Sequence, residues 1–223
     1  MRKISIYDIN IVKYIKEEKR FMQEKKIIAI FGGSFNPPLK SHLLLAKKII
    51  NEINNIEKLI FVPVSTNYKK ESLEQNEHRY NMLKLFCMEN KKMDVSRIEI
   101  DSKRQLFTIE TLEYMKTKYE ENDIYFILGT DNLKLLSEWH NAHELVHRFK
   151  FIVLERQQDD VEEIIMENQF LRDNFKNYIK IKNDETSEFS SSLIRDMLKH
   201  KIDVSKFMPK YIYEYIKKNN LYE

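Results

Sequence analysis

His42 and the residues just before it are the first in this sequence whose types and spacing could do chemistry. The segment reads Gly32-Gly33-Ser34-Phe35-Asn36-Pro37-Pro38-Leu39-Lys40-Ser41-His42, between an apolar run and a helical pattern. Small residues let backbone N–H groups approach phosphate oxygens, and a helix N-terminus adds unpaired donors and the positive end of a dipole. His42, in the first helical turn, could donate a ring N–H to the same phosphates. The segment lacks the Walker and Gly-x-Gly-x-x-Gly spacings, so a tight turn with a surface histidine is the alternative.

Glycine is scarce in this sequence, and its positions are informative. Average usage would give about 15 glycines in a chain of this length. The sequence has three, Gly32, Gly33 and Gly129, and each follows an apolar, strand-like segment. We therefore expect glycine where a side chain would obstruct a turn of positive φ or the close approach of a ligand.

A third pattern points to different chemistry. His143-Glu144-Leu145-Val146-His147 matches His-Glu-x-x-His, the helix motif of zinc proteases, in which two imidazoles on one helical face bind zinc and the glutamate activates a bound water. The following segment, 149–155, reads as a strand rather than as a helix with a third ligand. We expect Leu145 and Val146 to pack in the core, and we expect no metal site in the protein.

An alternation of strands and helices must position these residues. Apolar runs predict strands at 27–31, 58–63, 95–100, 124–128, 150–155 and 178–182, and helical spacing predicts helices at 41–54, 77–90, 108–120, 131–148, 160–168, 191–200 and 209–218. This rhythm is typical of an α/β fold with a doubly wound parallel sheet and helices on both faces. Ligands bind such sheets beyond the carboxyl ends of the strands, where the glycines lie. Residues 63–76 are polar and aperiodic, which predicts a mobile loop over that site.

The chain divides into two unequal parts. Residues 1–24 are charged and weakly amphipathic, which predicts an N-terminal helical extension. Residues 25–223 are then a single domain that ends in a small helical portion.

Composition and charge exclude several classes of protein. The 38 basic and 35 acidic side chains leave a net charge of +3 and are interspersed along the chain, so nucleic-acid binding is not indicated. No apolar run approaches the roughly 20 residues of a membrane span, and the N-terminus lacks the apolar core of a secretory signal. We therefore expect a cytoplasmic protein without membrane contact. Cys87, the single cysteine, should be a buried structural thiol.

Several motifs, in the right order, resemble one known family. Gly32 to His42 resembles the Gly-Gly-x-Phe-Asp/Asn-Pro-x-His-x-Gly-His signature of the nucleotidylyltransferase superfamily. Further segments resemble the bacterial nicotinate mononucleotide adenylyltransferase branch of that superfamily. They are Phe107 to Thr111, Gly129 to Leu133 followed by Trp139, Phe189 to Arg195, and the ending Met208 to Glu223. The likeness covers residues 27–223. It implies a Rossmann-like fold and the transfer of an adenylyl group from ATP, with Mg²⁺, to a pyridine mononucleotide.

The resemblance also implies roles for the matching residues. Displacement at the α-phosphorus of ATP needs alignment and charge stabilisation rather than a covalent nucleophile. His42 and Arg195 would contact the phosphates, and further ATP contacts would come from Gly32, Gly33, Ser34, Phe35, Gly129, Asp131, Ser191 and Ser192. The pyridine mononucleotide would contact Trp139, which stacks on the ring, as well as Thr108 and Lys70.

Each of these residue types has an ordinary structural use as well. Ser191 and Ser192 could simply cap a helix, and Asp131 could be an N-cap. Trp139 is the only tryptophan and could be a core aromatic. Lys69 and Lys70 could serve solubility alone.

Two departures from the family pattern bear on rate and substrate choice. Leu39 stands where the signature has its first histidine, and Ser41 where it has glycine; the Pro-Pro-His-Lys of the substrate loop is Asn67-Tyr68-Lys69-Lys70 here. Losing one electrostatic contact typically costs ~10²–10³ in rate. We expect Lys40 or the loop lysines to supply the missing positive charge, so Lys40 joins His42 and Arg195 as a candidate catalytic residue.

Other functions stay open from the sequence. Nicotinamide mononucleotide could replace nicotinate mononucleotide, and a sister transferase would use phosphopantetheine or an alcohol phosphate. Trp139 and the long C-terminal portion favour a pyridine nucleotide. Leu39 favours a catalytically weakened nucleotide-binding protein, against which His42 and Arg195 argue. Assembly into a homo-oligomer is left open.

Overall fold

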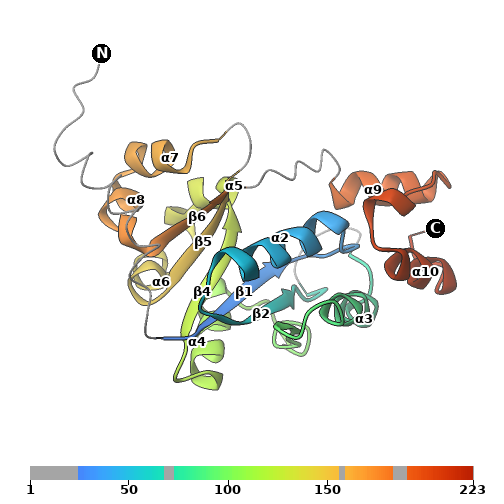
Figure 1. The fold of residues 1–223 in the computed structure, drawn as a ribbon, viewed down its shortest axis with the longest axis horizontal. Coiled ribbons are helices and arrows are strands. Elements are labelled where there is room, and N and C mark those ends of the chain that lie inside the picture. Colours follow the sequence, from blue (N-terminus) through green and yellow to red (C-terminus); the bar gives the residue numbers. More distant parts are fainter. Residues whose placement is uncertain (1–24, 68–72, 156–158, 183–189, 223) are drawn as a thin grey trace, which may run out of the picture.

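The computed structural model describes residues 25–67, 73–155, 159–182 and 190–222 (Figure 1). Within them a single sheet of six strands has the order β3-β2-β1-β4-β5-β6, and every neighbouring pair is parallel. The strands are β1 Ile27–Gly33, β2 Ile56–Pro63, β3 Met93–Val95, β4 Asp123–Gly129, β5 Lys150–Glu155 and β6 Tyr178–Lys182. This is the doubly wound, Rossmann-like order, and it confirms the predicted fold class. The predicted helix at 1–24 lies outside the described residues.

The helices follow the predicted alternation with one subdivision. They are α2 Lys40–Glu52, α3 Asn76–Cys87, α4 Thr108–Lys118, α5 Thr130–Lys134, α6 Ala142–Arg148, α7 Val161–Glu167, α8 Gln169–Asp173, α9 Ser191–Lys199 and α10 Lys210–Lys218, with short 3-10 turns η2 Leu136–Glu138, η3 Phe175–Asn177 and η4 Ser205–Phe207. The predicted helical region 131–148 is thus divided into α5, η2 and α6. Each described helix is too short or too polar to cross a bilayer.

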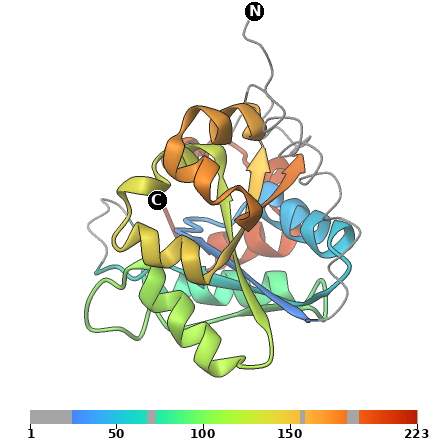
Figure 2. The same cartoon turned by 90° about the vertical axis from the view of Figure 1, so that its left-hand side faces the viewer.

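The alternation of side chains along β1 divides the core into two layers. Ile27, Ala29 and Phe31 pack in one cluster with α2, α3, α9 and α10, whereas Ile28 and Ile30 pack in another with α4 through α8. Successive side chains of a strand point to opposite faces, so a strand that is apolar at every position is buried on both. Figure 2 shows α2, in blue, on one side of the sheet and the green and yellow helices α4 and α6 on the other.

One predicted strand was misplaced. The strand expected at 95–100 is instead β3, Met93–Val95, because the chain turns at Arg97, whose side chain bonds Glu77 of α3 and Asp101. The helix expected at 160–168 is confirmed as α7, Val161–Glu167, and Asn168 caps the separate helix α8 by accepting a hydrogen bond from the Leu171 N–H at 3.2 Å.

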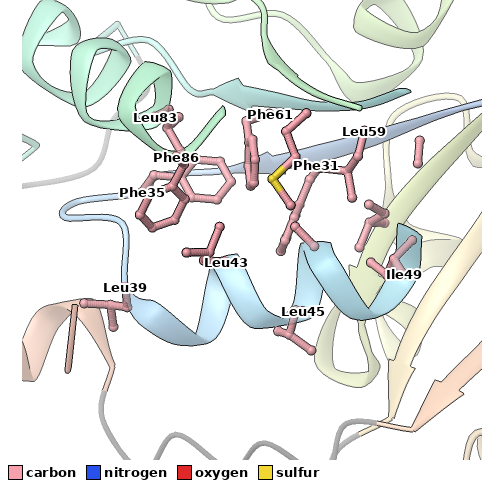
Figure 3. Packing of buried hydrophobic residues seen from close by; sticks show 14 of the residues in the cluster. Phe31, Phe35, Leu39, Leu43, Leu45, Ile49, Leu59, Phe61, Leu83 and Phe86 are labelled. Carbon is pink, nitrogen blue, oxygen red and sulfur yellow. The ribbon is translucent and has the colours of Figure 1, made fainter. Parts of the chain in front are cut away.

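Aromatic side chains support the loop that follows β1. Phe35 packs edge-on against Phe31 and Phe61 with ring centroids 5.6 and 5.5 Å apart, and Phe86 of α3 lies against Phe61. Figure 3 shows these rings beside α2, with Leu39 at the first turn of that helix. The buried cluster is continuous with the C-terminal helices, so the loop after β1 is built on a fixed base.

Candidate functional site

The two glycine motifs lie side by side at the carboxyl edge of the sheet. β1 pairs with β2 on one side and with β4 on the other, and Phe31 of β1 is level with Ile127 of β4. Gly32 and Gly33 end β1, and Gly129 ends β4. The chain order reverses direction between these two strands, which is where doubly wound sheets bind ligands.

None of the three glycines has positive φ, so none is needed for a left-handed turn. A Cβ on Gly32 would lie 3.1 Å from the ring of Phe126, and a Cβ on Gly33 would lie 3.1 Å from the ring of Phe35. Phe35 itself takes the left-handed conformation of this loop, with φ 45°. A Cβ on Gly129 would meet no atom within 4 Å. Gly129 therefore borders open space, as the close approach of a ligand requires.

The loop between β1 and α2 is joined to the N-terminus of α9, more than 150 positions later. Ser191 Oγ donates to the main-chain oxygen of Pro37 at 3.0 Å, and Arg195 Nη1 donates to that of Asn36 at 2.9 Å. The cap of α9 is Ser190, whose side chain accepts from the Leu193 N–H. The sequence-based assignment of the cap to Ser191 and Ser192 was therefore wrong. Ser191 is free to bond the loop because Ser190 caps the helix, and Ser192 Oγ accepts from Arg195 Nη2 at 3.3 Å.

His42 is held as a neutral donor at the start of α2. The Leu39 N–H donates to His42 Nδ1 at 2.9 Å, so Nδ1 is unprotonated and the ring proton resides on Nε2. Desolvation lowers the His42 pKa from 6.5 to about 4, although part of the ring reaches the surface. The ring packs edge-on against Phe35, with centroids 5.2 Å apart. His42 thus offers one N–H and no charge at neutral pH.

Leu39, which stands where the family signature has its first histidine, offers no polar group to a ligand. Its side chain is 3% exposed and belongs to the same apolar cluster as Ile194 and Leu198 of α9. Lys40 is exposed at the first position of α2. Its compensating role stays a prediction.

Asp131 lies in the first turn of α5 and is exposed. The N-cap of that helix is Gly129, so the alternative in which Asp131 caps the helix was wrong. Thr130 is fully buried, and its hydroxyl bonds Asp159, which also pairs with Lys134 at 2.6 Å. These bonds fix the start of α5 to the segment after β5.

The residues expected at the pyridine ring lie in one neighbourhood. Phe107 and His140 are stacked, with centroids 3.9 Å apart and planes inclined by 17°. Phe107 is the N-cap of α4, directly before Thr108, and His140 directly follows Trp139. Trp139 is half-buried and packs edge-on against Phe126, the same ring that lies beside Gly32. Trp139 is thus neither fully exposed nor a core residue.

Lys69 and Lys70 lie outside the described residues. The described start of that loop is tied down, since the Thr66 N–H donates to Asn76 Oδ1 at 2.9 Å and Asn67 Nδ2 donates to the oxygen of Ser102 at 3.0 Å.

Arg79 is the main structural residue that the sequence did not reveal. It is fully buried, and its guanidinium donates to the main-chain oxygens of Ser34, Val64 and Glu74 at 2.9, 2.6 and 2.9 Å. Desolvation lowers its pKa from the ordinary value. The loop after β1 and both ends of the loop between β2 and α3 therefore share one buried cation.

Asn36 is a second such residue. Its side-chain oxygen accepts from the Glu74 N–H at 3.1 Å and from the Tyr222 hydroxyl at 2.9 Å. The signature contains an aspartate or asparagine at this position, but the sequence does not show which atoms would meet it.

Among the described residues, the carboxylates close enough together to hold a metal ion are Glu155, Asp160 and Glu162. Lys180 Nζ already pairs with Glu155 and Glu162. The His-Glu-x-x-His segment is not part of this group. Its Glu144 pairs with Arg148 at 2.8 Å.

The chain is similar to known proteins in three comparisons: with a family profile, with individual sequences and with solved structures. The sequence profile of the family described as Cytidylyltransferase-like matches residues 30–197. A protein of Fusobacterium nucleatum named "Probable nicotinate-nucleotide adenylyltransferase" is 36% identical over 193 residues, which is 86% of this chain and 97% of its own length. A protein of the same name from Carboxydothermus hydrogenoformans is 33% identical over 196 residues, 87% of this chain and 97% of its own. The solved structure of Plasmodium falciparum nicotinic acid mononucleotide adenylyltransferase complexed with NaAD aligns with a TM-score of 0.73 and 27% identity, over 88% of this chain and 97% of that one.

Proposed function

Because the chain belongs to the family of nicotinate-nucleotide adenylyltransferases, within the Cytidylyltransferase-like family, we propose that it transfers the adenylyl group of ATP to nicotinate mononucleotide. The products are nicotinate adenine dinucleotide and pyrophosphate, and the reaction is a step of NAD biosynthesis. The zinc-protease alternative is set aside, since this family assignment covers most of the chain.

One observation carries the proposal. The loop after β1 and the N-terminus of α9 are bonded through Ser191 to Pro37 and Arg195 to Asn36, which joins the segment of Arg195 to the loop that leads into α2 and His42. Gly129, with open space at its Cα, ends the neighbouring strand. We propose that a nucleotide lies over Gly129, with its phosphates near the N-termini of α2 and α9, since helix N-termini favour anions.

The chemistry divides between a neutral donor and a cation. An oxygen of the mononucleotide phosphate attacks the α-phosphorus of ATP, a new P–O bond forms, and the bond from the α-phosphorus to the oxygen bridging to the β-phosphorus breaks. His42 donates its Nε2–H to a phosphate oxygen without adding charge. Arg195 neutralises the charge that develops on the leaving pyrophosphate, and the segment of Ser191 and Ser192 donates hydrogen bonds to it.

Mg²⁺ is proposed as part of the substrate, bound to the phosphates of ATP. The residues proposed at the phosphates are neutral or basic, so they suit Mg-ATP better than a free metal ion.

The pyridine ring is proposed to stack on Trp139, with Thr108 and His140 nearby. The choice of nicotinate over nicotinamide rests on the names of the relatives. The Plasmodium falciparum enzyme is also described as complexed with APC. A cytoplasmic location and a homo-oligomeric state stay predictions.

Pyrophosphate release tests the proposal. Wild-type protein is given ATP and Mg²⁺ with nicotinate mononucleotide, nicotinamide mononucleotide or phosphopantetheine in separate reactions. We expect turnover with nicotinate mononucleotide and a loss of ~10²–10³ in rate in His42→Ala, because one preorganised donor is removed.

Two results would contradict the proposal. Faster turnover with phosphopantetheine would assign the chain to a sister transferase. Binding of ATP without turnover on any acceptor would make it a nucleotide-binding protein, with Leu39 as the residue to revert to histidine.

A further inference from the structure

We propose that Tyr222 is a positioning residue for the ATP phosphates, because its hydroxyl fixes Asn36 and thereby the main-chain oxygen that orients Arg195. This inference rests on the proposed function and gives a role to Tyr222, a residue of the C-terminal segment to which the sequence assigned none.

Asn36 is the point at which three segments meet. It is 2% exposed, and its side-chain oxygen accepts from Tyr222 Oη at 2.9 Å and from the Glu74 N–H at 3.1 Å. Its main-chain oxygen accepts from Arg195 Nη1 at 2.9 Å. The two bonds to the buried side chain restrain the position of the whole residue, and with it the main-chain oxygen that accepts from Arg195.

The backbone that presents Tyr222 is itself unusual. Tyr222 has φ 66° and Asn220 has φ 49°, and a bulky side chain is disfavoured in that region unless its contacts hold it there. Between them Leu221 is 6% exposed, and its N–H bonds the oxygen of Ile216 in α10. The buried Leu221 thus anchors the turn, and the turn directs the Tyr222 ring back toward Asn36.

The Tyr222 hydroxyl stays protonated and can therefore always donate a hydrogen bond. Burial raises the pKa of Tyr222 above its ordinary value, so the proton remains on the oxygen at any physiological pH. Tyr222 and Arg195 also line the same pocket, together with Glu74 and Lys199. Tyr222 therefore lies close to Arg195 in the wall of one pocket.

Tyr222→Phe tests the inference by removing one oxygen. The matched control is Tyr215→Phe. It also deletes a partly buried tyrosine hydroxyl of the C-terminal segment, but this hydroxyl bonds His78 Nδ1 of α3 at 3.0 Å rather than Asn36. Three quantities are measured for each variant: the melting temperature, the affinity for a non-hydrolysable ATP analogue with Mg²⁺, and the KM values for ATP and nicotinate mononucleotide.

We expect Tyr222→Phe to weaken binding of the ATP analogue and raise the KM for ATP by roughly 3- to 10-fold, the size of one neutral hydrogen bond. The KM for nicotinate mononucleotide should stay unchanged. Amide hydrogen exchange should accelerate in residues 35–42 and not in the rest of the sheet. Tyr215→Phe should lower the melting temperature by a similar amount and leave both KM values as in the wild type.

A double-mutant cycle with Asn36→Ala makes the test specific. If Tyr222 acts through Asn36, the effect of Tyr222→Phe on ATP disappears in the Asn36→Ala background. Equal effects of Tyr222→Phe and Tyr215→Phe on ATP, or an unchanged KM for ATP in Tyr222→Phe, would overturn the inference. Analogue binding and exchange need no acceptor, so a wild-type protein that fails to turn over nicotinate mononucleotide would contradict the proposed function without deciding the role of Tyr222.

Discussion

Arg79 Nη1 donates a hydrogen bond to the main-chain oxygen of Ser34 at 2.9 Å, although 45 positions separate the two residues. The same guanidinium bonds the oxygens of Val64 and Glu74 and the side chain of Asn76. A planar guanidinium has five donors spread over three nitrogens and can reach carbonyls on several sides, whereas a lysine ammonium has three donors on a single atom. The ends of β1 and β2 and the start of α3 are therefore held in one arrangement by a single side chain.

Arg79→Met should lower the free energy of unfolding by roughly 3–5 kcal/mol, because it leaves buried carbonyl oxygens without donors. Denaturant unfolding measures the change. Arg148→Met is the control, since Arg148 pairs with Glu144 while 39% exposed and should lose less than about 1 kcal/mol. Similar losses for the two variants would show that the Arg79 bonds are not important for stability.

Gly129→Ala should separate binding from stability. The new methyl group meets no protein atom, and a Gly-to-Ala change at an ordinary φ tends to stabilise by ~0.4–1 kcal/mol. If adenosine lies over Gly129, the KM for ATP rises roughly 10-fold, since an extra methylene in a filled site costs about 1–3 kcal/mol. Gly32→Ala should instead lose stability, because its Cβ would press on Phe126. An unaltered KM for ATP in Gly129→Ala would remove Gly129 from the site.

The lowered pKa of His42 predicts the direction in which stability changes with pH. Its pKa is about 4 in the folded protein and near 6.5 otherwise, so the unfolded chain binds an extra proton between these values. The contribution of His42 to the free energy of unfolding therefore decreases as the pH falls from 6.5 to 4, by about 3 kcal/mol in total. The difference in stability between wild type and His42→Gln should follow this pH dependence, whereas the difference between wild type and His200→Gln, at an exposed histidine, should not. Nitrogen NMR should find the Nε2–H tautomer at pH 6; a ring that titrates near 6.5 would contradict the assignment.

Glu99 should give a slope of the opposite sign. Burial raises the Glu99 pKa from 4.5 to about 7, despite the hydrogen bond donated by Thr111 Oγ1 at 2.9 Å. The folded protein then holds a proton that the unfolded chain has lost, so stability decreases as the pH rises from 4.5 to 7, by about 3 kcal/mol. Glu99→Gln should remove this decrease, and Glu214→Gln, on the surface of α10, should not. In the wild type the contributions of Glu99 and His42 partly cancel between pH 4.5 and 6.5.

The stacked pair Phe107 and His140 should affect one substrate only. Phe107→Leu removes a ring–ring contact of about 0.5–1.5 kcal/mol that joins the residues beside Thr108 and Trp139. We expect the KM for nicotinate mononucleotide to rise about 2- to 10-fold and the KM for ATP to stay constant. Fluorescence of Trp139, the single tryptophan, reports binding directly. Tyr114→Leu, at an exposed aromatic of the same helix, is the control, and an equal effect there would argue against the pair.

The sequence predicted the sheet because its strands are buried on both faces. Ile27 through Phe31 are all apolar, and such a run has few alternatives once glycines end it. β3 was misplaced because an edge strand of three residues has a weak pattern, and the turn at Arg97 depends on Glu77 of another helix.

The sequence also placed the motifs of the site but not the residues that support them. His42, Ser191 and Arg195 stand in recognisable local patterns, and the structure brings their segments together. In the sequence, Arg79 looks like any other polar residue of an amphipathic helix. Its acceptors are main-chain oxygens of loops, which no residue type in the sequence marks. The neutral state of His42 depends on the packing of Phe35 and on the Leu39 N–H, which no spacing rule contains.

The bonds from Asn36 and Pro37 to Ser191, Arg195 and Tyr222 have a consequence for biosynthesis. They span 154, 159 and 186 positions, so a nascent chain can build β1 and α2 long before their partners leave the ribosome. At about 5–20 residues per second, that delay is on the order of ten to forty seconds. During it the first loop has neither Arg195 nor Tyr222, and high contact order makes the final docking slow. A truncated translation product would therefore carry the glycine motif without a complete phosphate site.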